Sequence, residues 1–189
     1  MKLSRVNTLL LVLIIVINGY TIVVPFLPSL FYKVQTKNGT RIHQLEQKVQ
    51  AAPPANAPNS LTMPTALFDG QIFDGPDART LSHGVWHRPG TSTPDRGGNT
   101  VVAGHRFTYT NPVGTFYHLD KIKSGDPIGV VWNNKSYRYT VTEVKVVGPN
   151  ETSIEAPTAI PQLTIYTCTP LWLPKDRLVV IAKPLEVQP

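Results

Sequence analysis

The chain has 189 residues, which is enough for one domain of ordinary size and an additional segment. Hydrophobic residues make up 41% and charged residues 16%, so the composition excludes an acidic disordered chain and a coiled coil. The net charge of +6 is uneven, because residues 1–60 carry +5 and residues 61–189 carry +1. A nearly neutral body lacks the positive surface that binds a phosphate backbone, so we expect no nucleic-acid partner.

An uncharged apolar segment lies near the N-terminus. No Asp, Glu, Lys or Arg occurs between Arg5 and Lys33, and Leu, Ile and Val dominate residues 9–27. A helix of about 20 apolar residues is long enough to cross the hydrocarbon core of a bilayer. We therefore expect residues 1–8 to form a short cytoplasmic tail and residues 9–31 to form a transmembrane signal-anchor.

The orientation of this anchor follows from its flanking charges. Lys2 and Arg5 favour a cytoplasmic N-terminus under the positive-inside rule, which leaves the C-terminal body outside. The alternative is a cleaved signal peptide, which has a shorter apolar region and a cleavage site of the Ala-x-Ala type. The apolar region here is longer and no such site directly follows it. We therefore favour an uncleaved, single-pass anchor.

The sequence after the anchor predicts a spacer. A polar stretch places Leu45 and Val49 at helical spacing, which predicts a short stalk helix. Residues 51–60 (AAPPANAPNS) have the composition of a semi-extended linker. We assign residues 32–60 to this stalk and linker and residues 61–189 to a globular domain.

The globular domain has the pattern of a mostly β protein. The chain contains 18 prolines and 13 glycines, which argues against an all-helical fold. Asn133 and Asn134 separate two β-rich runs and predict a hairpin turn. Residues 113–119 are the best candidate for a short helix. Many short strands joined by turns are typical of a β-sandwich or barrel. The expected strands are residues 100–103, 128–132, 137–147, 162–167 and 177–182.

Cys168 is the only cysteine, so no intrachain disulfide and no cysteine-rich zinc site can form. The thiol is therefore either a buried apolar filler or a nucleophile. Cys168 ends one apolar strand and Arg177 begins the next, so a hairpin would bring them to the same edge of the sheet. A permanently charged guanidinium at that edge is suited to stabilising an oxyanion.

A nucleophilic cysteine needs a group that transfers protons, and histidine is the usual one. Among the five histidines, His105 alone follows an apolar strand and a glycine, in the sequence VVAGHR. His43 lies in the expected stalk and His118 in the expected short helix. His83 and His87 would form a metal pair only on a helix and have no further ligands nearby, so we expect no metal site.

Three motifs in this order resemble the sortase family of surface-protein transpeptidases. They are VVAGHR at residues 101–106, LTIYTC at 163–168 and RLVVIA at 177–182. The second contains a Thr-x-x-Thr-Cys signature, and the resemblance extends over residues 61–189. It implies a mostly β fold, the sortase-like eight-stranded β-barrel with short helices, preceded by one N-terminal transmembrane helix. It also implies that the catalytic domain lies outside the bacterial cytoplasmic membrane.

The resemblance implies a cysteine transpeptidase. Cys168 would attack a sorting signal resembling Leu-Pro-x-Thr-Gly between Thr and Gly and form a thioacyl-enzyme. His105 would act as acid and base, and Arg177 would hold the substrate carbonyl or its oxyanion. Thr167 would help to line that pocket. The implied partners are surface proteins with a C-terminal sorting signal and an amine acceptor, such as a peptidoglycan precursor or a pilin lysine.

The resemblance also bears on the subclass. The sequence CTPLW and the short loop between Cys168 and Arg177 resemble class D or class E housekeeping sortases. The Asp-Pro-aromatic lid of pilin-assembling sortases has no counterpart here. Glu151 and Glu155 are too few ligands for a calcium site and are expected to be solvated, so we expect no cofactor.

Two alternatives remain at this stage. The sequence LSHGVWHR at residues 81–88 resembles the active-site stretch of L,D-transpeptidases, but Val85 occupies the position of the required cysteine. The other alternative is a membrane-tethered β-domain without enzymatic activity, in which Cys168 is only buried packing. Accessibility of the thiol separates this second alternative from an enzyme.

Overall fold

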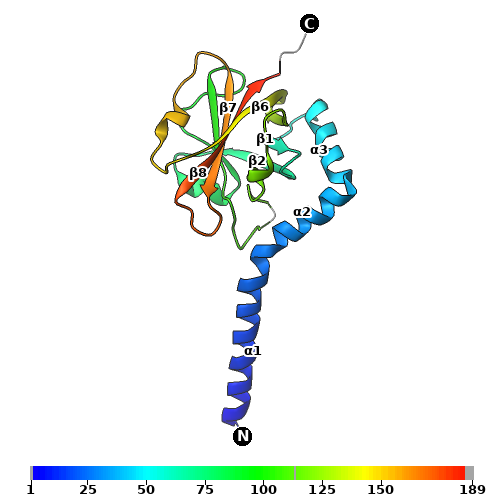
Figure 1. The fold of residues 1–189 in the computed structure, drawn as a ribbon, viewed down its shortest axis with the longest axis vertical. Helices are drawn as coiled ribbons and strands as arrows, with labels where there is room; N and C mark the ends of the chain where they lie inside the picture. The colour runs from blue at the N-terminus through cyan, green and yellow to red at the C-terminus, as the bar shows by residue number, and fades with distance from the viewer. Residues whose placement is uncertain (1, 113, 186–189) are drawn as a thin grey trace.

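The computed structural model of the chain describes residues 2–112 and 114–185. Its body is a closed barrel with strand order β1-β2-β3-β4-β7-β8-β6-β5 (Figure 1). The mostly β fold and the eight-stranded barrel are therefore confirmed. The strands are β1 (Ser60–Met63), β2 (Phe68–Asp74), β3 (Val85–His87), β4 (Asn99–Ala103), β5 (Pro127–Trp132), β6 (Lys135–Val147), β7 (Gln162–Thr169) and β8 (Asp176–Pro184).

The five strands expected from the sequence correspond to β4 to β8. The predicted turn is also present, because Asn133 and Asn134 adopt positive φ angles of 49° and 62° and Trp132 pairs with Lys135. Asn tolerates this left-handed conformation better than most residues, which explains why these two residues join β5 to β6.

The barrel interior is filled by the inward-facing side chains of the strands. Val102 of β4, Ile165 of β7 and Val180 of β8 are fully buried in one cluster with Phe116 and Leu119. Each such side chain contributes about 1.5–3 kcal/mol when it leaves water. This packing makes the parallel pair β4 and β7, with β8 beside them, a rigid support for the residues at their ends.

The prediction of a short helix at residues 113–119 is wrong. The described part, residues 114–118, forms bends and a turn, and the 3-10 helix η3 (Leu119–Lys121) follows; Val113 lies outside the described residues. The side chain of Phe116 enters the barrel, and a Cβ at Gly104 would lie only 2.6 Å from its ring. Burial of this ring explains why the segment folds inward.

The N-terminal helices differ from a free stalk. They are α1 (Lys2–Val23), the 3-10 helix η1 (Val24–Phe26), α2 (Leu27–Asn38) and α3 (Thr40–Gln50). Figure 1 shows α1 projecting from one end of the barrel, whereas α2 and α3 fold back along its side. Leu45 and Val49 are 1% and 3% exposed because α3 packs against β1, β5 and β6. The helix exists as expected, but its apolar residues attach it to the barrel.

Candidate active site

Three neighbouring strands bring the predicted site residues to one edge of the barrel. Cys168 on β7 lies directly opposite Arg177 on β8 in the antiparallel register, as the hairpin argument predicted. On the other side of β7, Ala103 at the end of β4 is in parallel register with Tyr166. His105 lies two residues beyond Ala103, and Cys168 lies two residues beyond Tyr166. Both residues therefore lie at the same end of the parallel pair of β4 and β7.

The ladder between β4 and β7 continues past the last residue of β4. The backbone N–H of Gly104 donates to the carbonyl of Tyr166 at 3.2 Å. The hydroxyl of Thr167, which is 2% exposed, donates to the carbonyl of Gly104 at 2.8 Å. These two contacts fix the residue before His105 against the residues before Cys168. A contribution of Thr167 to a substrate pocket remains a prediction.

Strand alternation determines which face carries the thiol. Leu163 and Ile165 of β7 point into the barrel core, so Cys168 points to the outer face. Leu178 of β8 likewise belongs to the core, so Arg177 also points outward. The Cys168 side chain is a free thiol in a partly exposed position. Cys168 is therefore not one of the fully buried residues of the core.

The segment between β6 and β7 contains the 3-10 helix η4 (Thr152–Glu155). We call it the wall, because it covers the outer face of β7 at Tyr166, two residues before Cys168. The buried Asn99 side chain donates to the carbonyls of Ile154 and Ala156, each at 3.0 Å. Its own side-chain oxygen accepts from the hydroxyl of Thr164 on β7 at 2.7 Å. A single amide therefore connects β4, β7 and this wall.

Glu155 fixes the same wall over the outer face of β7. Its Oε1 accepts from Nε of Arg88 at 2.8 Å and from the hydroxyl of Tyr166 at 2.7 Å. The guanidinium of Arg88 also lies over the ring of Trp86, 4.1 Å from its centroid. Burial, together with the neighbouring carboxylate of Glu155, raises the pKa of Tyr166. The expectation that Glu155 is solvated is therefore wrong, whereas Glu151 is exposed and caps η4 by accepting from the N–H of Ser153.

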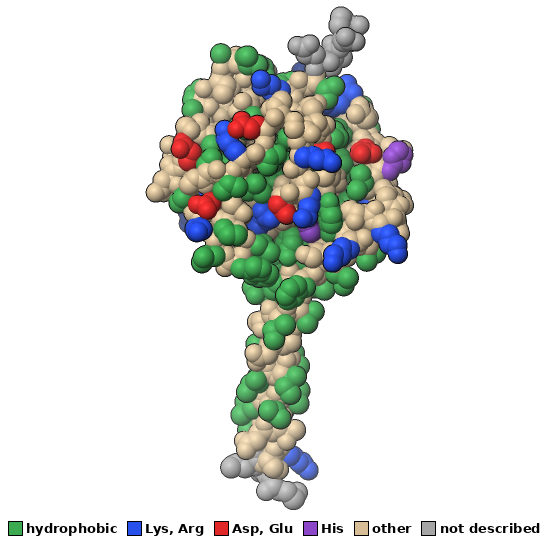
Figure 2. Space-filling view, viewed as in Figure 1, with side chains coloured by type: hydrophobic (Ala, Val, Ile, Leu, Met, Phe, Trp, Pro, Cys, Tyr) green, Lys and Arg blue, Asp and Glu red, His purple; other side chains and the backbone are tan. Residues whose placement is uncertain are grey.

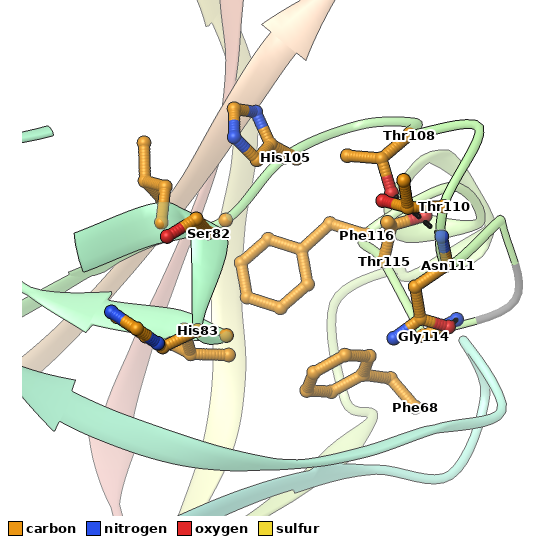
Figure 3. A pocket seen from close by; sticks show the side chains of 14 residues that line it. Phe68, Ser82, His83, His105, Thr108, Thr110, Asn111, Gly114, Thr115 and Phe116 are labelled. Atoms are coloured by element: carbon orange, nitrogen blue, oxygen red, sulfur yellow. Dashed lines mark hydrogen bonds between the residues drawn. The ribbon is translucent and has the colours of Figure 1, made fainter. Parts of the chain in front are cut away.

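A cavity of about 310 Å³ lies beside β3 and the end of β4 (Figure 3). The strand order puts it across β4 from β7, which carries Cys168. His105 lies at its edge, and the rings of Phe116 and Phe68, which meet edge to face, line it. One side is formed by the segment that leads into β3, including Ser82 and His83. The other side carries polar side chains from the loop after His105. They are Thr108, Thr110, Asn111 and Thr115.

The other histidines have contacts that belong to the scaffold. The buried His87 ring lies 2.7 Å from Oδ1 of Asp74 through Nδ1 and 2.9 Å from the carbonyl of Ser92 through Nε2. Nε2 of His118 donates to the carbonyl of Pro28 at 3.0 Å, and His83 packs against the ring of Phe73. The remaining one, His43, is exposed on α3 beside Gln47 and Glu46. His105 is thus the histidine that the topology brings to the Cys168 edge.

A partly exposed ion pair lies directly after His105: the Arg106 side chain is 11% exposed and the Asp120 side chain 41%. Nη2 of Arg106 donates to Oδ1 of Asp120 on η3 at 2.9 Å. Burial lowers the pKa of Arg106, and its Nε and Nη1 have no hydrogen-bond partner among the described residues. Because the guanidinium is largely removed from water, its bond to the carboxylate of Asp120 helps to hold the first residues of the His105 loop in place.

Sequence reasoning missed the residues that position the wall and the loop. Asn99, Arg88 and Asp120 act on elements distant from them in the chain, and no local motif marks such contacts. The only available signal for Tyr166 was strand alternation, which places it on the same face as Cys168, two residues earlier.

The residues 61–185 match the Sortase domain family model, and the chain belongs to the sortase family. It is 32% identical over 111 residues to sortase SrtE1 of Streptomyces coelicolor, covering 52% of this chain and 30% of that protein. It is 29% identical over 120 residues to sortase D of Bacillus subtilis, covering 63% of this chain and 57% of that protein. The chain thus spans less than two thirds of the length of these curated relatives.

The fold is similar to solved sortase structures. Sortase C-1 of Actinomyces oris superposes with a TM-score of 0.62 at 27% identity, covering 78% of this chain and 84% of that one. The family is therefore established by both sequence and fold. Members of this family are cysteine transpeptidases. Membership of the sortase family removes the support for the alternative of an L,D-transpeptidase. Val85, at the position where the latter needs its cysteine, is buried in the barrel core.

Proposed function

We propose that this protein is a membrane-anchored transpeptidase that cleaves an LPxTG-like sorting signal between Thr and Gly and transfers the new end to an amine. The observation that carries this proposal is the pairing of Cys168 with Arg177 on the outer face, with His105 following the neighbouring strand at the same edge. A thiol, a permanent cation and an imidazole are the groups that acyl transfer through a thioester requires.

In the first half-reaction the thiolate of Cys168 attacks the Thr carbonyl. The guanidinium of Arg177 donates to the oxygen on which negative charge develops, where a preorganised cation lowers the barrier most. His105 gives a proton to the leaving amine of Gly as the C–N bond breaks. The peptide after the scissile bond departs, and the rest remains as a thioester on Cys168.

In the second half-reaction an amine attacks the thioester. His105 now takes a proton from the incoming amine, and the thiolate of Cys168 leaves as the new amide forms. The cavity beside His105 is suited to the acceptor, because it lies across β4 from the thiol and is lined by hydroxyl and amide groups. The acceptor is a peptidoglycan precursor or a pilin lysine.

Two features support a class D or E housekeeping type. Both curated relatives described above carry class names, SrtE1 and sortase D. Between β7 and β8 the chain has only a short loop, and Glu155, the better-placed carboxylate for a cation, is already paired with Arg88. We therefore propose that the enzyme works without calcium or another cofactor.

The proposed location is the outer face of the bacterial cytoplasmic membrane. Residues Ser4–Asn38 form one apolar helical segment long enough to cross a bilayer. Lys2 and Arg5 precede it and favour a cytoplasmic N-terminus. The barrel that follows is then extracytoplasmic, where surface proteins present their sorting signals.

The test is transfer by the full chain in detergent micelles. A panel of sorting-signal peptides is incubated with an amine acceptor, and the products are identified by mass spectrometry. We expect an amide between the Thr carbonyl and the acceptor, which is lost in Cys168→Ala and His105→Ala. Cleavage that persists in Cys168→Ala, or an uncleaved panel with folded wild-type protein, contradicts the proposal.

A further inference from the structure

The N-terminal helical segment is longer than a single membrane crossing. The run Ser4–Asn38 contains 35 residues, which corresponds to about 52 Å of helix at 1.5 Å per residue. The hydrocarbon core of a bilayer is only about 30 Å thick. The helix is interrupted at η1, where the hydroxyl of Tyr117 on the barrel donates to the carbonyl of Pro25 at 3.0 Å. The part after η1 therefore remains beside the barrel, outside the crossing.

α2 has two different faces after this interruption. One face packs on the barrel, because Pro28 accepts from His118 and the hydroxyl of Tyr32 donates to the carbonyl of Thr65. The other face carries large apolar side chains at positions i, i+3, i+4 and i+7, the spacing of one helical stripe. This α2 stripe is exposed by 39–60% and consists of Leu27, Leu30, Phe31 and Val34.

The loops beside Cys168 expose further apolar side chains. Trp172 and Leu173, in the loop between β7 and β8, are 61% and 67% exposed. The ring of Trp172 lies 6.4 Å from that of Phe26 and 6.3 Å from that of Phe107. These four residues and Tyr109, which is 45% exposed, form the rim patch.

The rim patch is continuous with the top of α1. The hydroxyl of Tyr20 on α1 donates to the carbonyl of Tyr109 at 3.0 Å, and the two rings lie 6.1 Å apart. Figure 1 shows the loop between β7 and β8 at the end of the barrel from which α1 projects. Figure 2 shows hydrophobic side chains gathered on the underside of the barrel around this junction. Tyr and Trp at such a position are typical of the boundary between lipid and water.

Exposed lysines flank this surface, and the acidic groups near it are Asp120 and Asp126, which face Tyr32 of α2, and Asp176 at the start of β8. α2 carries Lys33 and Lys37, both exposed, and contains no acidic residue. The loop after Cys168 adds the exposed Lys175. An apolar stripe flanked by lysines is the pattern of a helix that lies in the interface of an anionic bilayer.

We propose that the α2 stripe and the rim patch dock the barrel onto the outer surface of the bilayer. The occupant of this surface is the headgroup and upper acyl region of the lipid. The proposal rests on the membrane anchoring put forward above, and it adds that the active-site edge itself contacts lipid.

Docking has a direct consequence for the substrate. Trp172 lies only four residues beyond Cys168, so a loop inserted at the interface holds the nucleophile within a few residues of the lipid surface. A scissile bond that reaches Cys168 must therefore lie close to the membrane.

The experiment uses the full chain in vesicles that contain phosphatidylglycerol and phosphatidylcholine brominated near the headgroup end of the acyl chain. Bromine quenches tryptophan only at close contact. Trp86 and Trp132 are each 5% exposed, so their emission is a constant background. The Trp172→Phe variant measures this background. The matched control adds Ile160→Trp to Trp172→Phe, because Ile160 is 65% exposed just before the other end of β7.

We expect the Trp172 signal to fall by roughly half or more in brominated vesicles, as for an aromatic residue at the interface. The tryptophan at position 160 should remain unquenched. An unquenched Trp172 in vesicle-bound protein overturns the docking proposal. Quenching of Trp172 that decreases as more protein is bound per vesicle also overturns it, because a second copy of the chain would then cover Trp172 in place of lipid. Loss of vesicle binding itself, measured by flotation, would instead contradict the anchoring on which the proposal rests.

Discussion

Cys168 and Arg177 occupy directly opposed positions in the antiparallel pair of β7 and β8. Both point to the outer face of the barrel, since their neighbours Thr167 and Leu178 are buried on the inner side. The register of a two-stranded ladder, rather than a flexible loop, therefore sets the separation between nucleophile and cation. Their relationship is the basis for the chemistry proposed here.

The first prediction concerns the cation. Arg177→Ala should lower kcat/KM for peptide cleavage by about 100- to 1,000-fold, the usual loss when one oxyanion donor is removed. Arg177→Lys should recover only part of this loss, because an ammonium lacks the planar fork of guanidinium. Steady-state cleavage kinetics measure both. A folded Arg177→Ala protein within about twofold of wild type would remove Arg177 from the mechanism.

The second prediction concerns Thr167 as a positioning residue. Thr167→Val removes the hydrogen bond to the partly buried carbonyl of Gly104 and should cost about 1–2 kcal/mol of stability. Because Gly104 directly precedes His105, kcat should fall more than KM rises. Thr167→Ser retains the hydroxyl and is the matched control. Equal effects of both variants on kcat would show that the hydroxyl does not position His105.

The third prediction concerns the wall at η4. Glu155→Gln weakens the contacts to Arg88 and Tyr166 and should lower the free energy of unfolding by about 1 kcal/mol, since the ion pair is partly exposed. The loosened wall should also raise KM for the sorting-signal peptide. Glu151→Gln on the same segment retains its capping oxygen and serves as control. Denaturant unfolding and cleavage kinetics should change for Glu155→Gln alone.

The fourth prediction concerns pH and the attachment of α2. Burial lowers the pKa of His118, whose Nε2 donates to the carbonyl of Pro28. The unfolded chain, with a histidine pKa of about 6.5, therefore binds more protons than the folded chain below that pH. Stability contributed by neutral His118 is complete above about pH 6.5 and is lost as the pH falls towards its lowered folded pKa.

Denaturant unfolding of the full chain in micelles between about pH 7 and pH 5 measures this effect. His118→Gln should flatten the decrease, because glutamine can donate to the same carbonyl without titrating. His43→Gln, on the exposed face of α3, should leave the decrease unchanged. An unchanged slope in His118→Gln would contradict the assignment.

The sequence predicted those features that depend on local pattern. The runs that became β4 to β8 are apolar and β-branched, and Asn133 and Asn134 suit a turn with positive φ. β1, β2 and β3 gave no comparable signal, because they are short or, like β2 with Gly70, interrupted. That the barrel has eight strands, and therefore contains these three, followed only from the family resemblance.

Features that depend on tertiary contacts were missed or wrong. Residues 114–118 have no helix because Phe116 is buried in the barrel, and Glu155 is paired because Arg88 approaches from a distant segment. The spacing of Leu45 and Val49 predicted a helix correctly, but it contained no information about the strands that bury them. The shared position of Cys168 and Arg177 at one edge of the sheet was predictable, because strands that are neighbours in the sequence pair as a hairpin and no distant contact has to be known.

The most direct measurement is the intact mass of the full chain mixed with a sorting-signal peptide in the absence of an amine acceptor. The account predicts a covalent adduct with the mass of the peptide up to its Thr, located on Cys168 and released by an added amine. Cys168→Ala should carry no adduct. An adduct on another residue, or none on a folded chain that cleaves the peptide, would contradict the thioacyl mechanism.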